Sequence, residues 1–315
     1  MKILFMGTPE FARVSLEYLI KNKCEVIGIV TQPDKPVGRK MTLTPPPVKE
    51  YALSENIPVY QPQTLKSAEF FDLIKEIAPD IIIVAAYGKL IPKYILDFPQ
   101  YGCVDVHGSL LPKYRGASPI NAAIMNGEKV TGITIMYMDE GIDTGDMILK
   151  ESTGIGKHET FGELHDRLAE IGGKLLIEAI NQIQNGTVKR EKQPESDTFY
   201  AKKIDDDMCE IDWNIPAKVI YDKIRGLSPS PAAFTWLNGK KLKILKAIYS
   251  DYKDVSAIKD KKSGEVIDIR NNIEVFAIGY TIIILELQLE GGKIMSAKDF
   301  VNGRKIEKGM ILGEK

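Results

Sequence analysis

The sequence predicts an α/β protein, with a Rossmann-like, doubly wound and mainly parallel sheet followed by a small β-barrel domain. Three observations lead to this prediction. Short apolar runs alternate with stretches of helical periodicity through the first part of the chain. A polar stretch near residue 190 interrupts that pattern, and the remaining third contains short β-rich runs separated by turn residues. At 315 residues, 44% of them hydrophobic, the chain is long enough to form two cores.

The first domain begins with an apolar run at 2–6, which predicts a strand, and with helical spacing over 11–19, which predicts a helix. Further strands are expected at 25–30, 57–60, 80–85, 102–107 and 130–138, and further helices at 67–78, 117–126 and 160–185. Alternating strands and helices indicate a parallel sheet, whose ligands bind at the carboxyl ends of the strands. The loops that follow residues 6, 85, 107 and 138 are therefore expected to meet around one crevice.

The second domain follows a segment of charged and polar residues that includes Pro194. We expect a catalytic domain over 1–189, a linker over 190–206 and a C-terminal domain over 207–315. One helix is expected at 216–226, and strands at 232–237, 242–248, 263–269, 273–278 and 281–287. Turn signals such as Asn238-Gly239 separate these strands, which favours a small, OB-like β-barrel.

Composition limits the possible partners. Forty-two basic and forty-three acidic residues give a net charge of −1, so any RNA must be held by local patches rather than by the field of the whole protein. Three scattered cysteines predict neither a disulfide framework nor a zinc cluster. No apolar run approaches the roughly 20 residues of a membrane span, so we expect a soluble, cytoplasmic protein.

Two polar loops follow predicted strands. The first reads His107-Gly-Ser-Leu-Leu-Pro-Lys-Tyr-Arg-Gly116, and the second reads Met138-Asp-Glu-Gly-Ile-Asp-Thr-Gly-Asp146. A histidine whose basicity is set by a nearby carboxylate can take a proton from an attacking amine. A structural His107 and a turn-forming Asp143 are the alternatives. The loop after the first strand lacks the Gly-x-Gly-x-x-Gly pattern, which argues against a dinucleotide site.

These loops, together with Phe5-Met-Gly-Thr-Pro-Glu-Phe11, resemble those of the methionyl-tRNA formyltransferase family over essentially all 315 residues. The two loops alone are shared with glycinamide ribonucleotide transformylases, formyltetrahydrofolate hydrolases and sugar-amine formyltransferases. Segment 31–49 narrows the choice, because it resembles the family's extended tRNA-binding loop. The resemblance implies formyl transfer from 10-formyltetrahydrofolate to the α-amine of methionyl initiator tRNA, without a metal and by a monomer. A sugar-amine formyltransferase is the alternative enzyme.

The resemblance also implies roles for individual residues. His107 matches the catalytic histidine, and Asp143 matches the aspartate that orients it or relays protons through water. The expected folate contacts are Ser109, Leu110, Leu111 and Pro112, with Tyr87, Gly88 and Leu90 forming another wall of the pterin pocket. The expected tRNA contacts are Arg39 and Lys40 in the extended loop, and Lys241 and Lys243 in the C-terminal domain. For these two C-terminal lysines, a solvated face is the alternative.

One catalytic position departs from the family pattern. Where the family has asparagine two residues before the histidine, this chain has Asp105. An amide can donate an N–H to the formyl oxygen as that oxygen gains negative charge, whereas an ionised carboxylate cannot donate. Three interpretations are open: a protonated Asp105 donates its O–H, another group supplies the donor, or the residue marks an engineered, deamidated or impaired protein. The third would leave a non-catalytic relative that binds folate or RNA.

Overall fold

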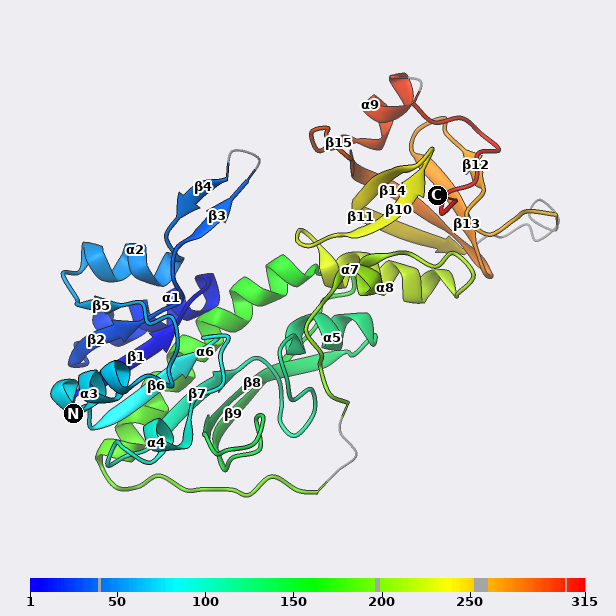
Figure 1. Cartoon of the computed structure of the whole chain (residues 1–315). Coiled ribbons are helices and arrows are strands. Elements are labelled where there is room, and N and C mark those ends of the chain that lie inside the picture. Colours follow the sequence, from blue (N-terminus) through cyan, green and yellow to red (C-terminus); the bar gives the residue numbers. More distant parts are fainter. Residues whose placement is uncertain (39–40, 196–198, 252–259, 304, 315) are drawn as a thin grey trace. The chain divides into compact units, whose positions relative to one another are not determined.

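The computed structural model describes residues 1–38, 41–195, 199–251, 260–303 and 305–314 (Figure 1). The chain divides into two compact units, and each is described by itself. Unit 1 comprises residues 1–119, 130–153 and 165–201, and unit 2 comprises 120–129, 154–164 and 202–315. Two segments that the sequence places in the catalytic domain, 120–129 and 154–164, thus associate with the C-terminal unit. Conversely, most of the expected linker belongs to unit 1.

Unit 1 contains a seven-stranded sheet in the order β5-β2-β1-β6-β7-β8-β9. Its strands are β1 (Ile3–Gly7), β2 (Val26–Val30), β5 (Val59–Tyr60), β6 (Ile81–Ala85), β7 (Cys103–His107), β8 (Val130–Tyr137) and β9 (Met147–Gly154). The pairs from β5 to β7 are parallel, and β8 is antiparallel to β7. Every residue of β1, β6 and β7 is buried, and β1 and β6 are apolar throughout, which is why these two runs could be recognised in the sequence. The predicted fold class is confirmed.

Helices connect these strands. They are α1 (Glu10–Lys21), α2 (Pro47–Ser54), α3 (Ala68–Ile77), α4 (Lys93–Leu96), α5 (Pro119–Met125) and α6 (Phe161–Gln184). The sequence pattern predicted α1, α3, α5 and α6, but neither α2 nor α4. The Ser67 side chain caps α3 by accepting a hydrogen bond from the Phe70 N–H, and Ala78 ends that helix in the left-handed conformation. In the part of the chain that the structure describes, no helix is long and apolar enough to cross a membrane.

The extended loop of unit 1 contains a β-hairpin that the sequence pattern did not predict. Its strands are β3 (Lys35–Val37) and β4 (Thr42–Thr44), which pair with each other and stand out from the large sheet (Figure 1). At its base, the Lys49 ammonium lies 2.8 Å from both Asp34 and Gln61. Arg39 and Lys40, the expected tRNA contacts at the tip, lie outside the described residues.

Unit 2 is built on an antiparallel sheet in the order β10-β11-β14-β13-β12, with β15 also paired to β14. The strands are β10 (Ala233–Leu237), β11 (Lys240–Asp251), β12 (Val266–Asp268), β13 (Ile273–Ala277), β14 (Tyr280–Leu289) and β15 (Met295–Ser296). The helices are α7 (Asp206–Cys209), α8 (Ala217–Leu227) and α9 (Ala297–Asn302). Trp213, Tyr221 and Phe300 contribute to its core. This antiparallel architecture agrees with the predicted small β-barrel domain.

Candidate active site

His107 is the last residue of β7, at the carboxyl edge of the unit 1 sheet. Its side chain is 5% exposed, and its Nε2 lies 3.0 Å from the Tyr114 carbonyl oxygen. A carbonyl only accepts hydrogen bonds, so in the neutral ring Nε2 carries the hydrogen. The lone pair is therefore on Nδ1, the atom that faces Asp143.

Asp143 lies in the loop between β8 and β9, at a positive φ of 54°. One carboxylate oxygen, Oδ2, accepts a hydrogen bond from the Gly116 N–H at 2.7 Å and lies 3.6 Å from His107 Nδ1. Glycine is required at 145 in this loop, because a Cβ there would lie 1.8 Å from the Tyr137 carbonyl oxygen. The backbone of the loop thus directs Asp143 at the histidine, as the two motifs predicted.

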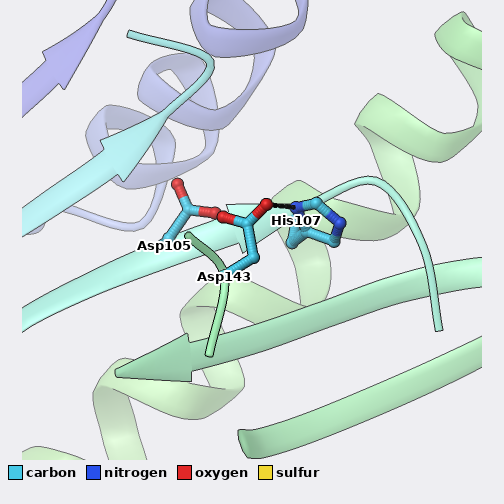
Figure 2. A group of neighbouring side chains, drawn as sticks. All are labelled: Asp105, His107 and Asp143. Atoms are coloured by element: carbon cyan, nitrogen blue, oxygen red, sulfur yellow. Dashed lines mark ion pairs between the residues drawn. The ribbon is translucent and has the colours of Figure 1, made fainter. Parts of the chain in front are cut away.

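Asp105 lies on the same face of β7 as His107, because alternate residues of a strand point the same way. It is 9% exposed. One ligand atom each from Asp105, His107 and Asp143 lie within 4.8 Å of one another, and Figure 2 shows the Asp143 carboxylate between the other two side chains. This spacing alone would also accommodate a metal ion, and the prediction that no metal is needed stays a prediction.

Burial controls how these groups ionise. Burial and then the charge of Asp143 raise the pKa of Asp105 well above its usual range, against a smaller opposing effect of the Val106 N–H. Burial also lowers the pKa of His107, although Asp143 and the hydrogen bond to Tyr114 oppose that shift. The resting site therefore favours a neutral imidazole beside a carboxyl group that retains its proton, since a buried Asp105 carboxylate would be repelled by the nearby Asp143 carboxylate.

The loop after His107 is held by hydrogen bonds to the neighbouring strand. The Thr134 hydroxyl of β8 donates to the Ser109 carbonyl at 2.7 Å and accepts from the Leu111 N–H at 3.1 Å, while the Ser109 hydroxyl donates to the Lys113 carbonyl. Ser109 and Leu111 are buried, whereas Leu110 and Pro112 are half-buried. The expected folate segment thus divides into residues that hold the loop and residues that present apolar surface.

The segment after β6 leaves the same edge of the sheet, because β6 and β7 are parallel with Val84 opposite Asp105. The Tyr87 carbonyl accepts hydrogen bonds from Thr8 Oγ1 at 3.2 Å and from Gln32 Nε2 at 3.0 Å. The Tyr87 ring, however, is buried within a core cluster, and its hydroxyl has no hydrogen-bond partner among the described residues. Of the three expected folate contacts in this segment, Gly88 and Leu90 are exposed, and Leu90 is 78% exposed.

The two expected tRNA contacts of unit 2 already have partners within that unit. The Lys241 ammonium lies 2.8 Å from the Asp206 carboxylate and 4.2 Å from the centre of the Phe234 ring. The Lys243 ammonium donates to the Pro231 carbonyl at 3.0 Å. A phosphate group would have to compete with these contacts. The structure therefore adds no support to the prediction that the two lysines bind tRNA.

Two residues of the site carry no signal in the motifs. Thr134 holds the loop that follows His107 through the Ser109 carbonyl. It can do so because it lies opposite His107 in the β7–β8 pairing. Gln193, within the expected linker, donates hydrogen bonds to the carbonyls of Asp143 and Gly145. A strand register could have identified the first. Nothing in the local sequence distinguishes the second from a solvated linker glutamine.

Comparison with known proteins identifies the family. A model described as "Formyl transferase" matches residues 1–180, and one described as "Formyl transferase, C-terminal domain" matches residues 203–305. The methionyl-tRNA formyltransferase of Alkaliphilus oremlandii is 48% identical over 317 residues, with 100% of both chains covered. The chain belongs to the methionyl-tRNA formyltransferase family. It is therefore a formyl-transferring enzyme, and the family resemblance inferred from the two loops, the opening motif and segment 31–49 is confirmed.

Other members of the methionyl-tRNA formyltransferase family match equally completely. The Clostridium tetani enzyme of that name is 46% identical over 314 residues, covering 99% of each chain. Among solved structures, WlaRD, a sugar 3N-formyl transferase studied with dTDP and 5-N-formyl-THF, has a TM-score of 0.65 at 21% identity and covers 90% of this chain and 97% of its own. HypX from Aquifex aeolicus in complex with tetrahydrofolic acid has a TM-score of 0.64 at 17% identity, covering 100% and 51% respectively. At these identities the solved structures show a shared fold.

Proposed function

We propose that this enzyme transfers a formyl group from 10-formyltetrahydrofolate to the α-amine of methionyl initiator tRNA. The observation that carries the proposal is the cluster of Asp105, His107 and Asp143 at the carboxyl edge of the sheet, in a chain whose full-length relatives are named methionyl-tRNA formyltransferase. In the reaction, the amine nitrogen bonds to the formyl carbon and loses a proton. The bond from that carbon to the folate nitrogen breaks, and this nitrogen takes up a proton.

His107 is the proposed general base. Its Nε2–H is committed to the Tyr114 carbonyl, so Nδ1 is the atom that accepts the amine proton. Because the pKa of His107 is lowered, the ring is neutral before the amine attacks and can then accept that proton. The Asp143 carboxylate, 3.6 Å from Nδ1, stabilises the positive charge that the ring then carries. The same proton can return to the leaving nitrogen.

Asp105 is the proposed hydrogen-bond donor to the formyl oxygen. A neutral carboxyl group has one O–H, and this O–H can take the place of an amide N–H toward an oxygen that gains negative charge. The burial of Asp105 and its closeness to Asp143 support this interpretation over an ionised, inactive site. The fold and the folate assignment are the same under each interpretation of Asp105.

The residues around the cluster fit a flat, partly apolar co-substrate. Leu110 and Pro112 present half-buried apolar surface in the loop that follows His107, and Leu90 exposes an apolar side chain in the segment that follows the neighbouring strand β6. Covering such surface with a heterocycle is favourable, at about 25 cal/mol per Å² of apolar area. Tyr87 would support this wall through its backbone, because its ring is buried. The co-substrate supplies the formyl group.

The hairpin of unit 1 is the proposed tRNA-binding element. In the sequence, Arg39 and Lys40 come between its two strands, outside the described residues, and the neighbouring Met41 and Leu43 are 67% and 63% exposed. A guanidinium can hold phosphate or base edges with two hydrogen bonds. Lys241 and Lys243 remain candidate phosphate contacts only if RNA displaces their present partners. A monomeric state and the absence of a membrane partner remain predictions.

A substrate comparison tests the proposal. The protein is incubated with 10-formyltetrahydrofolate and either methionyl initiator tRNA or an amino-sugar nucleotide, and formylated product is measured in each case. We expect product with the tRNA only. Turnover of the amino sugar in preference to the tRNA would contradict the proposal. Folate binding without turnover of either substrate would instead identify a binding protein.

A further inference from the structure

The segment after α6 packs against the catalytic loops, although the sequence predicts a linker there. Glu191 forms an antiparallel bridge with Met147, with N–H to carbonyl distances of 2.8 and 2.9 Å. The Arg190 guanidinium lies 3.7 Å from the centre of the Tyr137 ring. Figure 1 shows this stretch running extended after α6, as far as the residues drawn in grey. Residues 187–195 therefore belong to unit 1.

Gln193 joins this segment to both catalytic loops. Its Nε2 donates to the Asp143 carbonyl at 2.8 Å and to the Gly145 carbonyl at 2.9 Å. Its Oε1 accepts from Arg115 Nε at 3.0 Å and from Arg115 Nη2 at 2.6 Å. An amide side chain has two N–H donors and two lone pairs, so all of its hydrogen-bonding capacity is used here.

These four hydrogen bonds hold the Asp143 loop and the loop that contains Arg115, and each of these two loops contacts the His107 ring. Asp143 has a left-handed backbone, a conformation that costs free energy for any residue other than glycine, and Gln193 holds its carbonyl while the Gly116 N–H holds its carboxylate. Arg115 lies between Gly116 and Tyr114, whose carbonyl fixes the His107 ring. One side chain thus secures the partner of Nδ1 and the loop that holds the partner of Nε2.

We propose that Gln193 is a positioning residue for formyl transfer, which holds Asp143 and the Tyr114–Gly116 loop at their working distances from His107. The inference rests on the proposed function, since it assigns Gln193 to the same catalytic cluster. Gln193 touches no reacting atom. A glutamine that merely anchored the linker would affect the stability of the fold but neither the ionisation of His107 nor the chemical step.

Three variants separate these roles. Gln193→Met has similar length but no hydrogen bonds, and Gln193→Glu keeps an acceptor for Arg115 while losing the donors to the two carbonyls. Glu195→Ala, at an exposed position in the same segment, is the matched control. We expect both Gln193 variants to lower kcat by about 10- to 100-fold with little change in KM, because a misplacement of about 1 Å can cost about 10²-fold in rate. In combination with Asp143→Asn, the Gln193→Met loss should be much smaller than in the parent background.

The imidazole pKa of His107 gives a readout that does not depend on turnover. Among the described residues, the titratable groups grouped with this ring are Asp105 on its own strand and Asp143 from the loop after β8. Because the charge of Asp143 raises the pKa of His107, loosening Asp143 should lower that pKa further. Nitrogen-detected NMR titration of the full chain can follow it among only three histidines, with His107→Gln assigning the signal.

The expected result is a lower His107 pKa in Gln193→Met than in the parent and in Glu195→Ala. An unchanged pKa together with parental kcat would overturn the inference, and so would a lower melting temperature with no change in either quantity. If the parent protein formylates no tRNA, the proposed function fails. The titration then still decides whether Gln193 positions Asp143 against His107.

Discussion

Replacing Asp105 by asparagine should change turnover by an amount that depends on pH. Asparagine donates an N–H to the formyl oxygen at every pH, whereas Asp105 donates only while it is protonated. Burial and the neighbouring Asp143 raise the pKa of Asp105, so the parent is active below that pKa and loses its donor above it. The ratio of the two turnover numbers, Asn variant over parent, should therefore rise with pH.

The magnitude follows from the number of donors lost. Below the folded pKa of Asp105 the ratio should be near one, and above it the ratio should increase about tenfold per pH unit. It should level off at about 10²- to 10³-fold, the usual effect of removing one such donor. Stability should report the same proton at lower pH, below the folded pKa, because there the folded parent holds a proton that the unfolded chain releases. Between the usual pKa of an aspartate and the folded one, the free energy of unfolding of the parent should fall by about 1.4 kcal/mol per pH unit relative to the Asn variant.

Two measurements check this prediction. Single-turnover formylation of methionyl-tRNA at several pH values on both sides of the folded pKa gives the ratio of rates, and urea unfolding between the usual and the folded pKa gives the difference in stability. Folate affinity should differ little between the two proteins. A large ratio that does not vary with pH would show that Asp105 is ionised throughout and that the parent is impaired. An Asn variant that is no faster at any pH would refute the donor role itself.

The remaining predictions concern the base and the hairpin. His107→Ala should lower kcat by about 10²- to 10⁴-fold while leaving the circular dichroism spectrum unchanged, and near-normal turnover would remove the mechanism. The double variant His107→Ala with Asp143→Asn should lose much less kcat than the product of the two single losses, measured in the same assay. The reason is that both residues serve one proton transfer. Arg39→Ala should strongly reduce kcat/KM for methionyl-tRNA without changing folate binding, since the folate loops lie elsewhere. Lys40→Ala should cause a milder loss that varies with salt. A parental rate for Arg39→Ala would remove the main reason for preferring tRNA to an amino sugar.

Burial explains which elements of the fold could be predicted from the sequence. The strands β1 and β6 are apolar throughout and fully buried, and their limits were predicted closely, as were those of the buried strand β7, which also contains Asp105 and His107. The edge strand β9 was not predicted, because most of it is at least partly exposed and its residues are largely polar. The hairpin of β3 and β4 was also missed, since its strands have three residues each and prolines flank or occupy them.

Long-range hydrogen bonds explain which parts of the site could not be predicted. The loops bearing His107 and Asp143 were recognised from their motifs, and their meeting follows from the positions of the strand ends. Gln193 was assigned to a linker, because an extended polar segment has no periodicity that reveals what its side chains contact. The ionisation of Asp105 was likewise open, since it depends on burial and on a carboxylate from another loop.

The central claim is that His107 and its two carboxyl neighbours catalyse formyl transfer to methionyl-tRNA. The most direct measurement uses 10-formyltetrahydrofolate labelled in the formyl carbon, with methionyl initiator tRNA and excess enzyme in a single turnover. The account predicts that label appears as formylmethionine on the tRNA with the parent protein, and that the rate collapses in His107→Ala although folate still binds. No transfer of label by the parent or by Asp105→Asn, or equal transfer by parent and His107→Ala, would contradict it.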